Sequence, residues 1–332
     1  MKAVLMTAIG GPETLQLTQI AEPEALGPRE VKVALRAAGI NPVDTKIRRN
    51  GLFYPTAQLP AVLGCDGAGE VVAIGSEVSR FRIGDSVWFC HGGLGREQGN
   101  YAQYTTIDER WAGRKPANID FIEAAAAPLV LITAWGALYD RGRLQAGQTV
   151  LVHAGAGGVG HVAIQLAKLR GARVFATAGT PETLALSRQW GADEVIDYRT
   201  HDFAEVVNKL TQDRGADLVI DTVGPEVFSR SIHCTAHFGD IVTLLDFGDT
   251  PLNEARMRNL RIGYELMLTP MLRDLQDARV HHVEILDQCG RWMEEGKLKI
   301  HVGKVLPMEA AADAHRLIET GHMVGKAVLT AV

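Results

Sequence analysis

Three glycines, Gly155, Gly157 and Gly160, have the spacing G-x-G-x-x-G and carry the clearest chemistry in the chain. They follow a short apolar run at 150–153 and open a stretch at 160–170 with the apolar period of a helix. In this context glycines let the backbone turn tightly and approach a pyrophosphate, whose charge the first N–H groups of the helix stabilise. The pattern therefore predicts a dinucleotide site formed by Gly155, Gly157, Gly158, Val159 and Gly160.

The end of the next expected strand, 173–177, bears on which dinucleotide binds. In NAD-binding folds a carboxylate about 20 residues beyond the glycine turn takes the ribose hydroxyls. Here the strand is followed by Gly179 and Thr180, and then by Pro181, which is a good first residue for a helix. Such a helix offers N–H groups to a 2′-phosphate, which favours NADPH over NADH. No Lys or Arg lies between residues 179 and 186, so the cationic partner that a phosphate often has is missing there.

Apolar runs and amphipathic stretches alternate around this motif. We expect strands at 150–153, 173–177, 194–196, 218–221 and 240–244, and helices at 160–170, 181–190, 203–212 and 227–236. This alternation predicts an α/β fold with a parallel, doubly wound sheet. The first third is instead β-rich and interrupted by Gly and Pro turn signals. The tail beyond about residue 280 resembles the first third, so we expect both ends of the chain to form one domain.

Composition excludes several classes of protein. Among 332 residues, 34 Lys and Arg face 39 Asp and Glu, so the formal net charge is −5 and a basic footprint for nucleic acid is missing. The longest nearly apolar stretch, 124–132, is too short to span a bilayer. No cleavage site follows the brief apolar run at the start. Four scattered cysteines without C-x-x-C spacing are typical of a reducing compartment, so we expect a cytoplasmic protein.

Four segments besides the glycine turn resemble the medium-chain dehydrogenase/reductase superfamily, and most closely its quinone oxidoreductase (zeta-crystallin-like) branch. They read AGINPVDT at 38–45, LGCDGAG at 63–69, LITAW at 131–135 and GHMVGKAVL at 321–329. The resemblance implies a GroES-like β-rich domain, residues 1–122 and 268–332, and a Rossmann domain, residues 123–267. It also implies NADPH-dependent reduction of quinones or related conjugated carbonyls by hydride transfer in the interdomain cleft, and a homodimer paired through the sheet edge near 261–266.

Alcohol dehydrogenases of this superfamily bind a catalytic zinc, and the resemblance places their ligand positions at Asn41, at Cys65 with Asp66, and at Leu129. Only Cys65 and Asp66 are able to bind a metal, and two ligands do not make a tetrahedral zinc site. We therefore expect no zinc. Without a Lewis acid, hydride delivery to a quinone or enone is easier than alcohol oxidation, because the charge delocalises onto an oxygen that hydrogen-bond donors serve.

The resemblance also assigns roles to single residues. The catalytic candidates beside the nicotinamide are Asn41, Asp44 and Lys46. The further cofactor candidates are Thr133 near the carboxamide, Gly179, Thr180 and Tyr198 in the adenosine-phosphate pocket, Leu245, Asp246, Phe247 and Gly248 in the nicotinamide half, and Lys326 in the terminal motif. The family usually has Tyr where this chain has Lys46. It often has Lys where this chain has Thr183, and the absence of that Lys weakens the case for NADPH.

Plainer roles exist for several of these residues. Asn41 and Asp44 also suit Asx turns around Pro42. A mid-helix Thr133 can bond back to its own helix, and Tyr198 can be a packing residue on an edge strand. The pair His281 and His282 is expected in an exposed loop.

Two alternative functions stay open. One is an enoyl-thioester or alkenal reductase of the same superfamily, although no basic cluster for a CoA phosphate is evident. The other is a non-catalytic NADPH-binding protein, as the lens crystallins of this family are.

Overall fold

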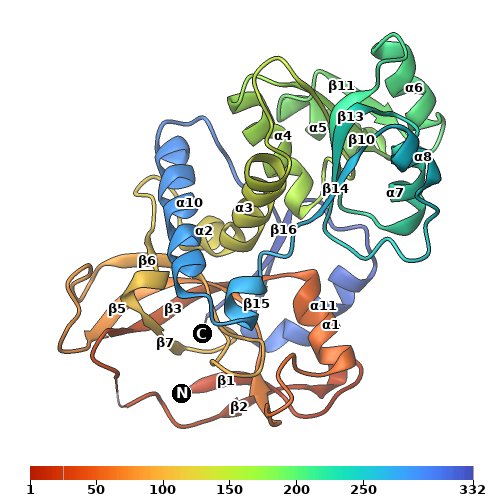
Figure 1. The fold of residues 1–332 in the computed structure, drawn as a ribbon. Coiled ribbons are helices and arrows are strands. Elements are labelled where there is room, and N and C mark those ends of the chain that lie inside the picture. Colours follow the sequence, from red (N-terminus) through yellow and green to blue (C-terminus); the bar gives the residue numbers. More distant parts are fainter. Residues whose placement is uncertain (25, 332) are drawn as a thin grey trace. The chain divides into compact units, whose positions relative to one another are not determined.

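The structure is a computed structural model that describes residues 1–24 and 26–331. Its internal contacts divide the chain into two compact units. Unit 1 comprises Met1–Leu129 and Leu268–Val332, and unit 2 comprises Val130–Met267. Both ends of the chain therefore belong to unit 1, and unit 2 is an insertion between them (Figure 1).

Unit 2 is a parallel sheet covered by helices. Its strands are β9 (Thr149–Val152), β10 (Arg173–Ala178), β11 (Glu194–Asp197), β12 (Ala216–Asp221), β13 (Thr235–Thr243) and β14 (Arg261–Tyr264). Its helices are α3 (Pro128–Trp135, which begins at the end of unit 1), the π-helix η3 (Gly136–Arg141), α4 (Gly158–Leu169), α5 (Pro181–Gln189), α6 (Phe203–Leu210), α7 (Pro225–Ile232) and α8 (Asn253–Met257). The strand order is β11-β10-β9-β12-β13-β14. The chain adds β10 and β11 on one side of β9 and then adds β12, β13 and β14 on its other side, as in a Rossmann domain.

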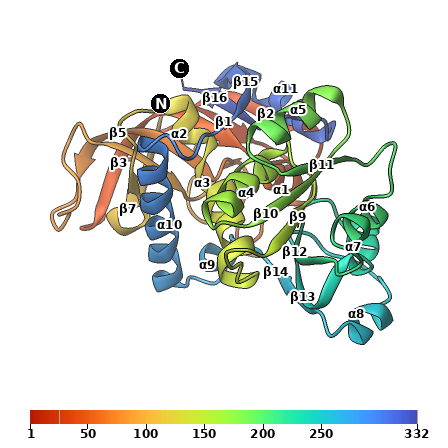
Figure 2. The same cartoon turned by 90° about the horizontal axis from the view of Figure 1, so that it is seen from above.

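The central strands of the unit 2 sheet are largely apolar and buried, whereas the edge strands β11 and β14 are partly exposed. Every residue of β9 is buried, and Leu151, Phe175 and Ile241 form one core cluster with Phe203 of α6 and Phe228 of α7. The helices α4 and α5 pack on β9, β10 and β11 (Figure 2). A parallel sheet buried in this way predicts near-continuous apolar strands, and this is what the sequence contains. The expected α/β fold is confirmed.

Unit 1 is rich in β-structure. Its strands are β1 (Lys2–Met6), β2 (Leu15–Gln19), β3 (Glu30–Ile40), β4 (Ala61–Val62), β5 (Asp66–Ile74), β6 (Ser86–Cys90), β7 (Tyr104–Asp108), β8 (Gly113–Arg114), β15 (Val302–Pro307) and β16 (Lys326–Thr330). Its helices are η1 (Pro12–Thr14), α1 (Pro42–Asn50), η2 (Glu109–Trp111), α2 (Phe121–Ala126), α9 (Thr269–Leu272), α10 (Gln276–Glu294), η4 (Met308–Ala310) and α11 (Ala311–Glu319). The main sheet runs β15-β16-β3-β5-β6-β8, with β7 also paired to β3, and the expected GroES-like domain is confirmed.

The register of this sheet brings the ends of four strands to one place. Gly39 at the end of β3 pairs with Asp66 at the start of β5, and Ile40 pairs with Ala327 at the start of β16. Asp66 also pairs with Cys90 at the end of β6. Segments from both ends of the chain therefore meet where β3 ends and α1 begins.

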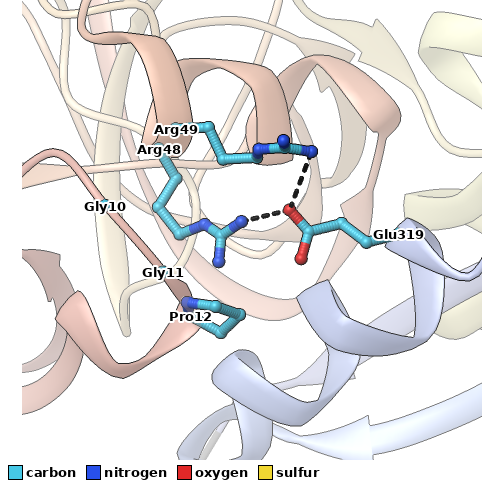
Figure 3. Close-up of a pocket in the computed structure, with 6 residues that line it drawn as sticks. All are labelled: Gly10, Gly11, Pro12, Arg48, Arg49 and Glu319. Carbon is cyan, nitrogen blue, oxygen red and sulfur yellow. Dashed lines mark hydrogen bonds and ion pairs between the residues drawn. The ribbon is translucent and has the colours of Figure 1, made fainter.

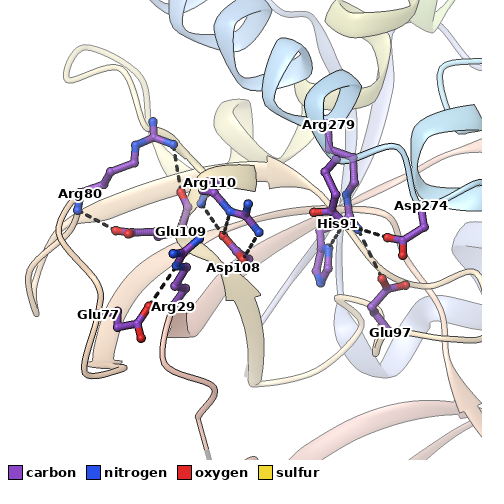
Figure 4. Close-up of polar contacts among 11 residues, drawn as sticks. Arg29, Glu77, Arg80, His91, Glu97, Asp108, Glu109, Arg110, Asp274 and Arg279 are labelled. Carbon is purple, nitrogen blue, oxygen red and sulfur yellow. Dashed lines mark hydrogen bonds and ion pairs between the residues drawn. The ribbon is translucent and has the colours of Figure 1, made fainter.

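A buried arginine, Arg279, fixes α10 to the sheet of unit 1. Figure 4 shows Arg279 of α10 reaching His91, to whose Nδ1 it donates at 2.7 Å, and Glu97 at 3.4 Å. The Arg279 guanidinium also lies 3.4 Å from the ring centre of Trp111. Burial, with the charge of Arg279 adding to it, lowers the pKa of His91 to about 3, so this histidine is a neutral acceptor.

Two sequence expectations differ from the structure in this unit. The first break between units, expected after residue 122, falls after Leu129, because α2 packs on β3, β5 and β16. The pair His281 and His282 was expected in a loop, but α10 begins at Gln276 and includes both residues. From the sequence, the apolar residues Val283, Ile285 and Leu286 predict a helix that begins only at Val283, seven residues after the observed start of α10.

Across the described residues, no helix has the length and apolar character needed to cross a membrane.

Candidate functional site

The glycine turn of unit 2 lies between β9 and α4. Gly160 is required by packing, since a Cβ there would lie 2.2 Å from the Ala154 carbonyl oxygen. Gly157 is the N-cap of α4 and, within the described chain, makes no side-chain cap, so the first N–H groups of α4 have no side-chain acceptor. The positive end of a helix with open N–H groups is an anion site, and the turn fits the pyrophosphate of a dinucleotide.

Hydrogen bonds from neighbouring strands fix the shape of this turn. Ala154 has a positive φ of 48°, and its N–H donates to Thr177 Oγ1 at 3.1 Å. His153 lies between Ser231 Oγ, 2.9 Å from its Nε2, and Thr177 Oγ1, 3.2 Å from its Nδ1. Burial, with the nearby charge of Arg230, lowers the pKa of His153 to about 3, so it is neutral. His153 is therefore a structural residue of the turn, which the sequence did not single out.

The end of β10 presents the residues expected around the adenosine phosphate. Thr180 caps α5, its Oγ1 accepting from the Thr183 N–H at 3.2 Å, while the Thr180 N–H donates to Thr183 Oγ1 at 3.0 Å. Tyr198, on the edge beyond β11 and half exposed, lies across Gly179, where a Cβ would come 2.6 Å from the phenol oxygen. The predicted start of the helix at Pro181 is confirmed. The capping box, however, uses N–H groups that the sequence analysis had assigned to a 2′-phosphate. The Glu182 N–H remains as a donor in this turn.

The loop Leu245–Gly248 follows β13 at the same edge of the sheet. Asp221, at the end of β12, accepts hydrogen bonds from the Val223 and Gly224 N–H groups at 3.0 and 3.1 Å and from Thr243 Oγ1 at 2.8 Å. The Thr243 hydroxyl in turn holds Leu245, whose N–H donates to it at 3.2 Å. This buried carboxylate thus fixes both loops at the carboxyl ends of the strands, where ligands of such sheets bind.

Phe247 is held by stacking in this loop. Its ring lies between Phe228, with centroids 4.5 Å apart, and Tyr264, with centroids 5.4 Å apart.

Thr133, expected near the carboxamide, is a buried residue of α3.

A polar cluster of unit 1, formed by Asn41, Asp44, Asp66 and Lys326, lies where the strand ends meet. Asn41 Nδ2 donates to Asp66 Oδ2 at 2.9 Å, and Lys326 Nζ donates to Asn41 Oδ1 and to the Ile40 carbonyl at 2.9 Å. Lys326 Nζ is also 3.8 Å from Asp66 Oδ2. The Asn41 N–H donates to Asp44 Oδ2 at 2.8 Å. All four side chains are buried.

Burial dominates the electrostatics of this polar cluster. Desolvation raises the pKa of Asp44 to about 7, against the hydrogen bond from the Asn41 N–H, and the nearby Asp66 charge adds to the rise. Desolvation also raises the pKa of Asp66 and lowers that of Lys326, while each charge partly offsets the shift of the other. The Asp44 carboxyl therefore binds a proton near neutral pH.

Three further residues adjoin the polar cluster that the sequence did not select. The Tyr101 hydroxyl donates to Asp44 Oδ2 at 3.1 Å and lies 3.3 Å from His315 Nε2. Cys90 lies against Cys65, and their hydrogen bond, together with burial, raises the pKa of the Cys65 thiol. No local pattern links these positions, because the strand register alone brings them together.

Two of the expected site residues differ in exposure. Lys46, on the second turn of α1, is exposed, whereas Lys326 is buried and pairs within unit 1.

The residues at the superfamily's zinc positions do not fit that metal. The Asp66 carboxylate already accepts from Asn41 Nδ2 and from the Leu129 N–H at 2.9 Å, and the Lys326 ammonium stands 3.8 Å away. The positive charge of Lys326 would repel a metal cation bound to Asp66. Among the described residues, no group of three or more His, Cys, Asp or Glu side chains is arranged to hold a metal ion.

Comparisons with known proteins agree with this architecture. The family model of the alcohol dehydrogenase GroES-like domain matches residues 27–117, and that of the zinc-binding dehydrogenases matches residues 190–329. A quinone oxidoreductase of Pseudomonas aeruginosa is 37% identical, covering 99% of each chain. The human quinone oxidoreductase is 30% identical, covering 99% of this chain and 97% of its own.

A solved structure shares the whole fold. The Escherichia coli quinone oxidoreductase complexed with NADPH aligns over 99% of this chain and 100% of its own, with a TM-score of 0.87 and 29% identity.

Proposed function

Because the chain belongs to the medium-chain dehydrogenase/reductase superfamily, in its quinone oxidoreductase branch, and is an NAD(P)-dependent oxidoreductase, we propose that it reduces quinones or related conjugated carbonyls with NADPH and without zinc. The observation that carries the proposal is the glycine turn. It places the open N–H groups of α4 at the carboxyl ends of the strands of unit 2. When bound there, NADPH would supply a hydride.

The turn Gly155–Gly160 would hold the pyrophosphate by its backbone. The 2′-phosphate would be held near Gly179, Thr180 and Tyr198, and the nicotinamide half near Thr133 and Leu245–Gly248, with Lys326 as a further candidate. Support for NADPH comes from the end of β10, which is followed by Gly179 and Thr180 where NAD-binding folds have a carboxylate. The half-exposed phenol of Tyr198 is available beside them.

Asn41, Asp44 and Lys46 would serve the acceptor. Reduction by a hydride leaves negative charge on the acceptor oxygen, and hydrogen-bond donors and a proton source stabilise it. Asp44 suits the second role, since a carboxyl with a pKa of about 7 is partly protonated at neutral pH. The exposed ammonium of Lys46 offers charge.

A cofactor and acceptor panel tests the proposal. NADPH and NADH oxidation by the pure protein is followed with quinones, enals and enoyl thioesters at one salt concentration. We expect the highest kcat/KM with NADPH and a quinone. Turnover with enoyl thioesters alone would favour the alternative reductase, and NADPH binding without turnover of any acceptor would contradict the proposal.

Independence from zinc is tested by metal removal. Metal analysis of the pure protein should find well under one zinc per chain, and a chelator should leave activity intact. One tightly bound zinc per chain, lost together with activity, would contradict this part of the proposal.

We also propose a cytoplasmic homodimer. The four cysteines are free thiols, which suits a reducing compartment. The strand β14 ends the sheet of unit 2 with Tyr264 half exposed, and an open edge strand can pair with a second copy. Light scattering should give twice the mass of one chain, and a proline at Ile262 should lower it.

A further inference from the structure

Three buried side chains of unit 1 form a hydrogen-bonded chain that begins at the polar cluster. Tyr101, between β6 and β7, lies 3.1 Å from Asp44 Oδ2 of α1 and 3.3 Å from His315 Nε2 of α11. The rings of Tyr101 and His315 meet edge to face, with centroids 5.8 Å apart. The Tyr101 ring also packs over Gly64, where a Cβ would come within 2.5 Å of it. The contacts leave Tyr101 little freedom to point elsewhere.

Both ends of this chain have an unused polar atom. Asp44 Oδ1 and His315 Nδ1 are buried and have no hydrogen-bond partner anywhere in the described residues. Leaving a buried polar atom unpartnered is unfavourable, so two such atoms at opposite ends of one hydrogen-bonded chain require a reason. Each is an acceptor position that a moving proton would occupy in passing.

The protonation states align the donors in one direction. Burial, with the charge of Arg48 adding to it, lowers the pKa of His315 to about 3, so the ring is neutral. Because the Tyr101 hydroxyl donates its proton to Asp44, its oxygen can only accept from His315 Nε2, which assigns the ring proton to that nitrogen. The Tyr101 hydroxyl then donates to Asp44. The order of donation is His315, Tyr101, Asp44.

The His315 end lies near an open pocket. Figure 3 shows this pocket of about 390 Å³, which is lined by Gly10, Gly11, Pro12, Arg48, Arg49 and Glu319. Arg48 crosses it to pair with Glu319, which follows His315 by one turn of α11. Arg48 has one side-chain partner of its own, and its Nε and Nη1 have none among the described residues. The pocket residue Glu319 therefore lies one turn of α11 from His315, whose own side chain is buried.

We propose that His315 and Tyr101 relay protons from this pocket to Asp44, which delivers them to the reduced acceptor. The inference rests on the proposed function, and it identifies the proton source of that reaction. Tyr101 and His315 act through Asp44 and are positioning residues, whereas Asp44 is the group that meets the acceptor.

The relay balances the reaction quinone + NADPH + H⁺ → hydroquinone + NADP⁺. Both electrons arrive with the hydride, so no side chain of the relay is oxidised or reduced. The Asp44 O–H bond breaks as a new O–H forms on the acceptor oxygen. The Tyr101 proton then moves to Asp44, the Nε2 proton of His315 moves to Tyr101, and His315 Nδ1 takes a proton from solvent. A flip of the His315 ring restores the starting state.

The groups around Asp44 set its proton affinity near the working pH. Asp66 on β5 raises its pKa, while the Asn41 N–H, the Tyr101 hydroxyl and Lys326 on β16 lower it. Burial outweighs these three, and the pKa is about 7. Near His315, at the other end of the hydrogen-bonded chain, the charged groups are Arg48 on α1 and its partner Glu319 on α11. A proton donor works best when its pKa lies near the pH of the reaction, and Asp44 meets this condition.

Tyr101→Phe tests the relay because it removes one oxygen and keeps the ring. With NADPH and a benzoquinone, we expect kcat to fall by about tenfold or more, as for loss of a general acid, while KM for NADPH stays within about twofold. The solvent isotope effect on kcat should rise, and the isotope effect of deuterated NADPH should fall, because proton transfer becomes limiting. His315→Gln should give the same changes, and the double variant should be no slower than either single one.

Matched controls are Tyr104→Phe, three positions along the chain, and His322→Gln beyond α11, both of which should behave as wild type. Unchanged kcat and isotope effects in Tyr101→Phe would overturn the relay. A lower Tm with unchanged isotope effects would show a structural role and overturn it equally. These results require an active wild type. A wild type that turns over no acceptor refutes the proposed function instead.

A second measurement needs no turnover. The infrared band of the protonated Asp44 carboxyl, assigned by its loss in Asp44→Asn, should titrate near pH 7 in the wild type. In Tyr101→Phe it should titrate at higher pH, because the hydrogen bond from Tyr101 lowers the pKa of Asp44. An Asp44 that stays ionised between pH 5 and 9, or that titrates identically in both proteins, would overturn the inference.

Discussion

The glycine turn of unit 2 and the polar cluster of unit 1 stabilise charge in opposite ways. The glycine turn uses backbone N–H groups and the end of α4, and the adjoining His153 is kept neutral by burial. The polar cluster uses two buried carboxyls and one buried ammonium, which come from α1, β5 and β16. The first site should therefore be sensitive to a single added methyl group and insensitive to pH. The second should be sensitive to charge and pH.

Removing the buried cation should have the largest effect. Lys326→Met leaves Asp66 buried without its ion-pair partner, and a broken buried pair costs about 3–5 kcal/mol of the free energy of unfolding. Urea denaturation at pH 8 measures this loss. Arg36→Met, which breaks the exposed pair with Glu70, should cost less than about 1 kcal/mol. The double variant Lys326→Met with Asp66→Asn should recover much of the loss, and equal losses in all three variants would contradict the comparison.

Asp44 should make the stability of unit 1 depend on pH. Its pKa is raised in the folded state, so the stabilisation is fully present below about pH 4 and is lost as pH rises through about 7. Relative to Asp44→Asn, the wild type should lose up to about 4 kcal/mol across this range. The difference between the two proteins isolates Asp44 from other titrating groups. A difference that is flat from pH 4 to 8 would show that Asp44 is not shifted.

A methyl group should disrupt the glycine turn more at Gly160 than at Gly157. In Gly160→Ala the new Cβ meets the Ala154 carbonyl oxygen, so backbone must shift, which costs about 1–3 kcal/mol in unfolding experiments. In Gly157→Ala the nearest atom is 3.2 Å away, and stability should change by less than about 0.5 kcal/mol. Neither loss should vary with pH. Equal losses would mean that the turn relaxes freely.

A charge at the end of β10 should change the cofactor preference by the smallest amount. Aspartate is as good an N-cap as threonine, so Thr180→Asp keeps α5 intact while repelling a 2′-phosphate. We expect a loss of ~1–2 kcal/mol, or roughly tenfold, in the preference for NADPH over NADH. Glu182→Gln should shift the preference slightly the other way. Steady-state kinetics with both cofactors measures this, and a wild type that prefers NADH would contradict the assignment.

Much of unit 2 could be predicted because its signals are local. The run at 150–153, the glycines after it and the period of 160–170 all lie within one βα unit, and the structure has β9 and α4 there. The capping box at Thr180 shows the limit of local reading. The sequence marks a helix start at that position. Only the structure shows that the N–H groups of Thr180 and Thr183 are used by each other's hydroxyl oxygens and are not open to a ligand.

The polar cluster illustrates what local patterns do not contain. Asn41 and Asp44 could be selected from one segment, but the partners that define their chemistry lie far away in the chain. Lys326 is 285 positions from Asn41, and His315 is 214 positions from Tyr101. No periodicity relates such residues, so their ion pairs and proton affinities were beyond sequence reasoning.

By itself the sequence determined the class of fold, the place of the glycine turn and the type of residue at each zinc position of the superfamily. These follow from side-chain period, backbone freedom and ligand chemistry, which are properties of short segments. The tertiary structure alone decided that the ends of β3 and β6 meet the starts of β5 and β16, and that burial there shifts the pKa values of Asp44, Asp66 and Lys326. The physical reason is that desolvation and ion pairing depend on which distant segments exclude water from one another.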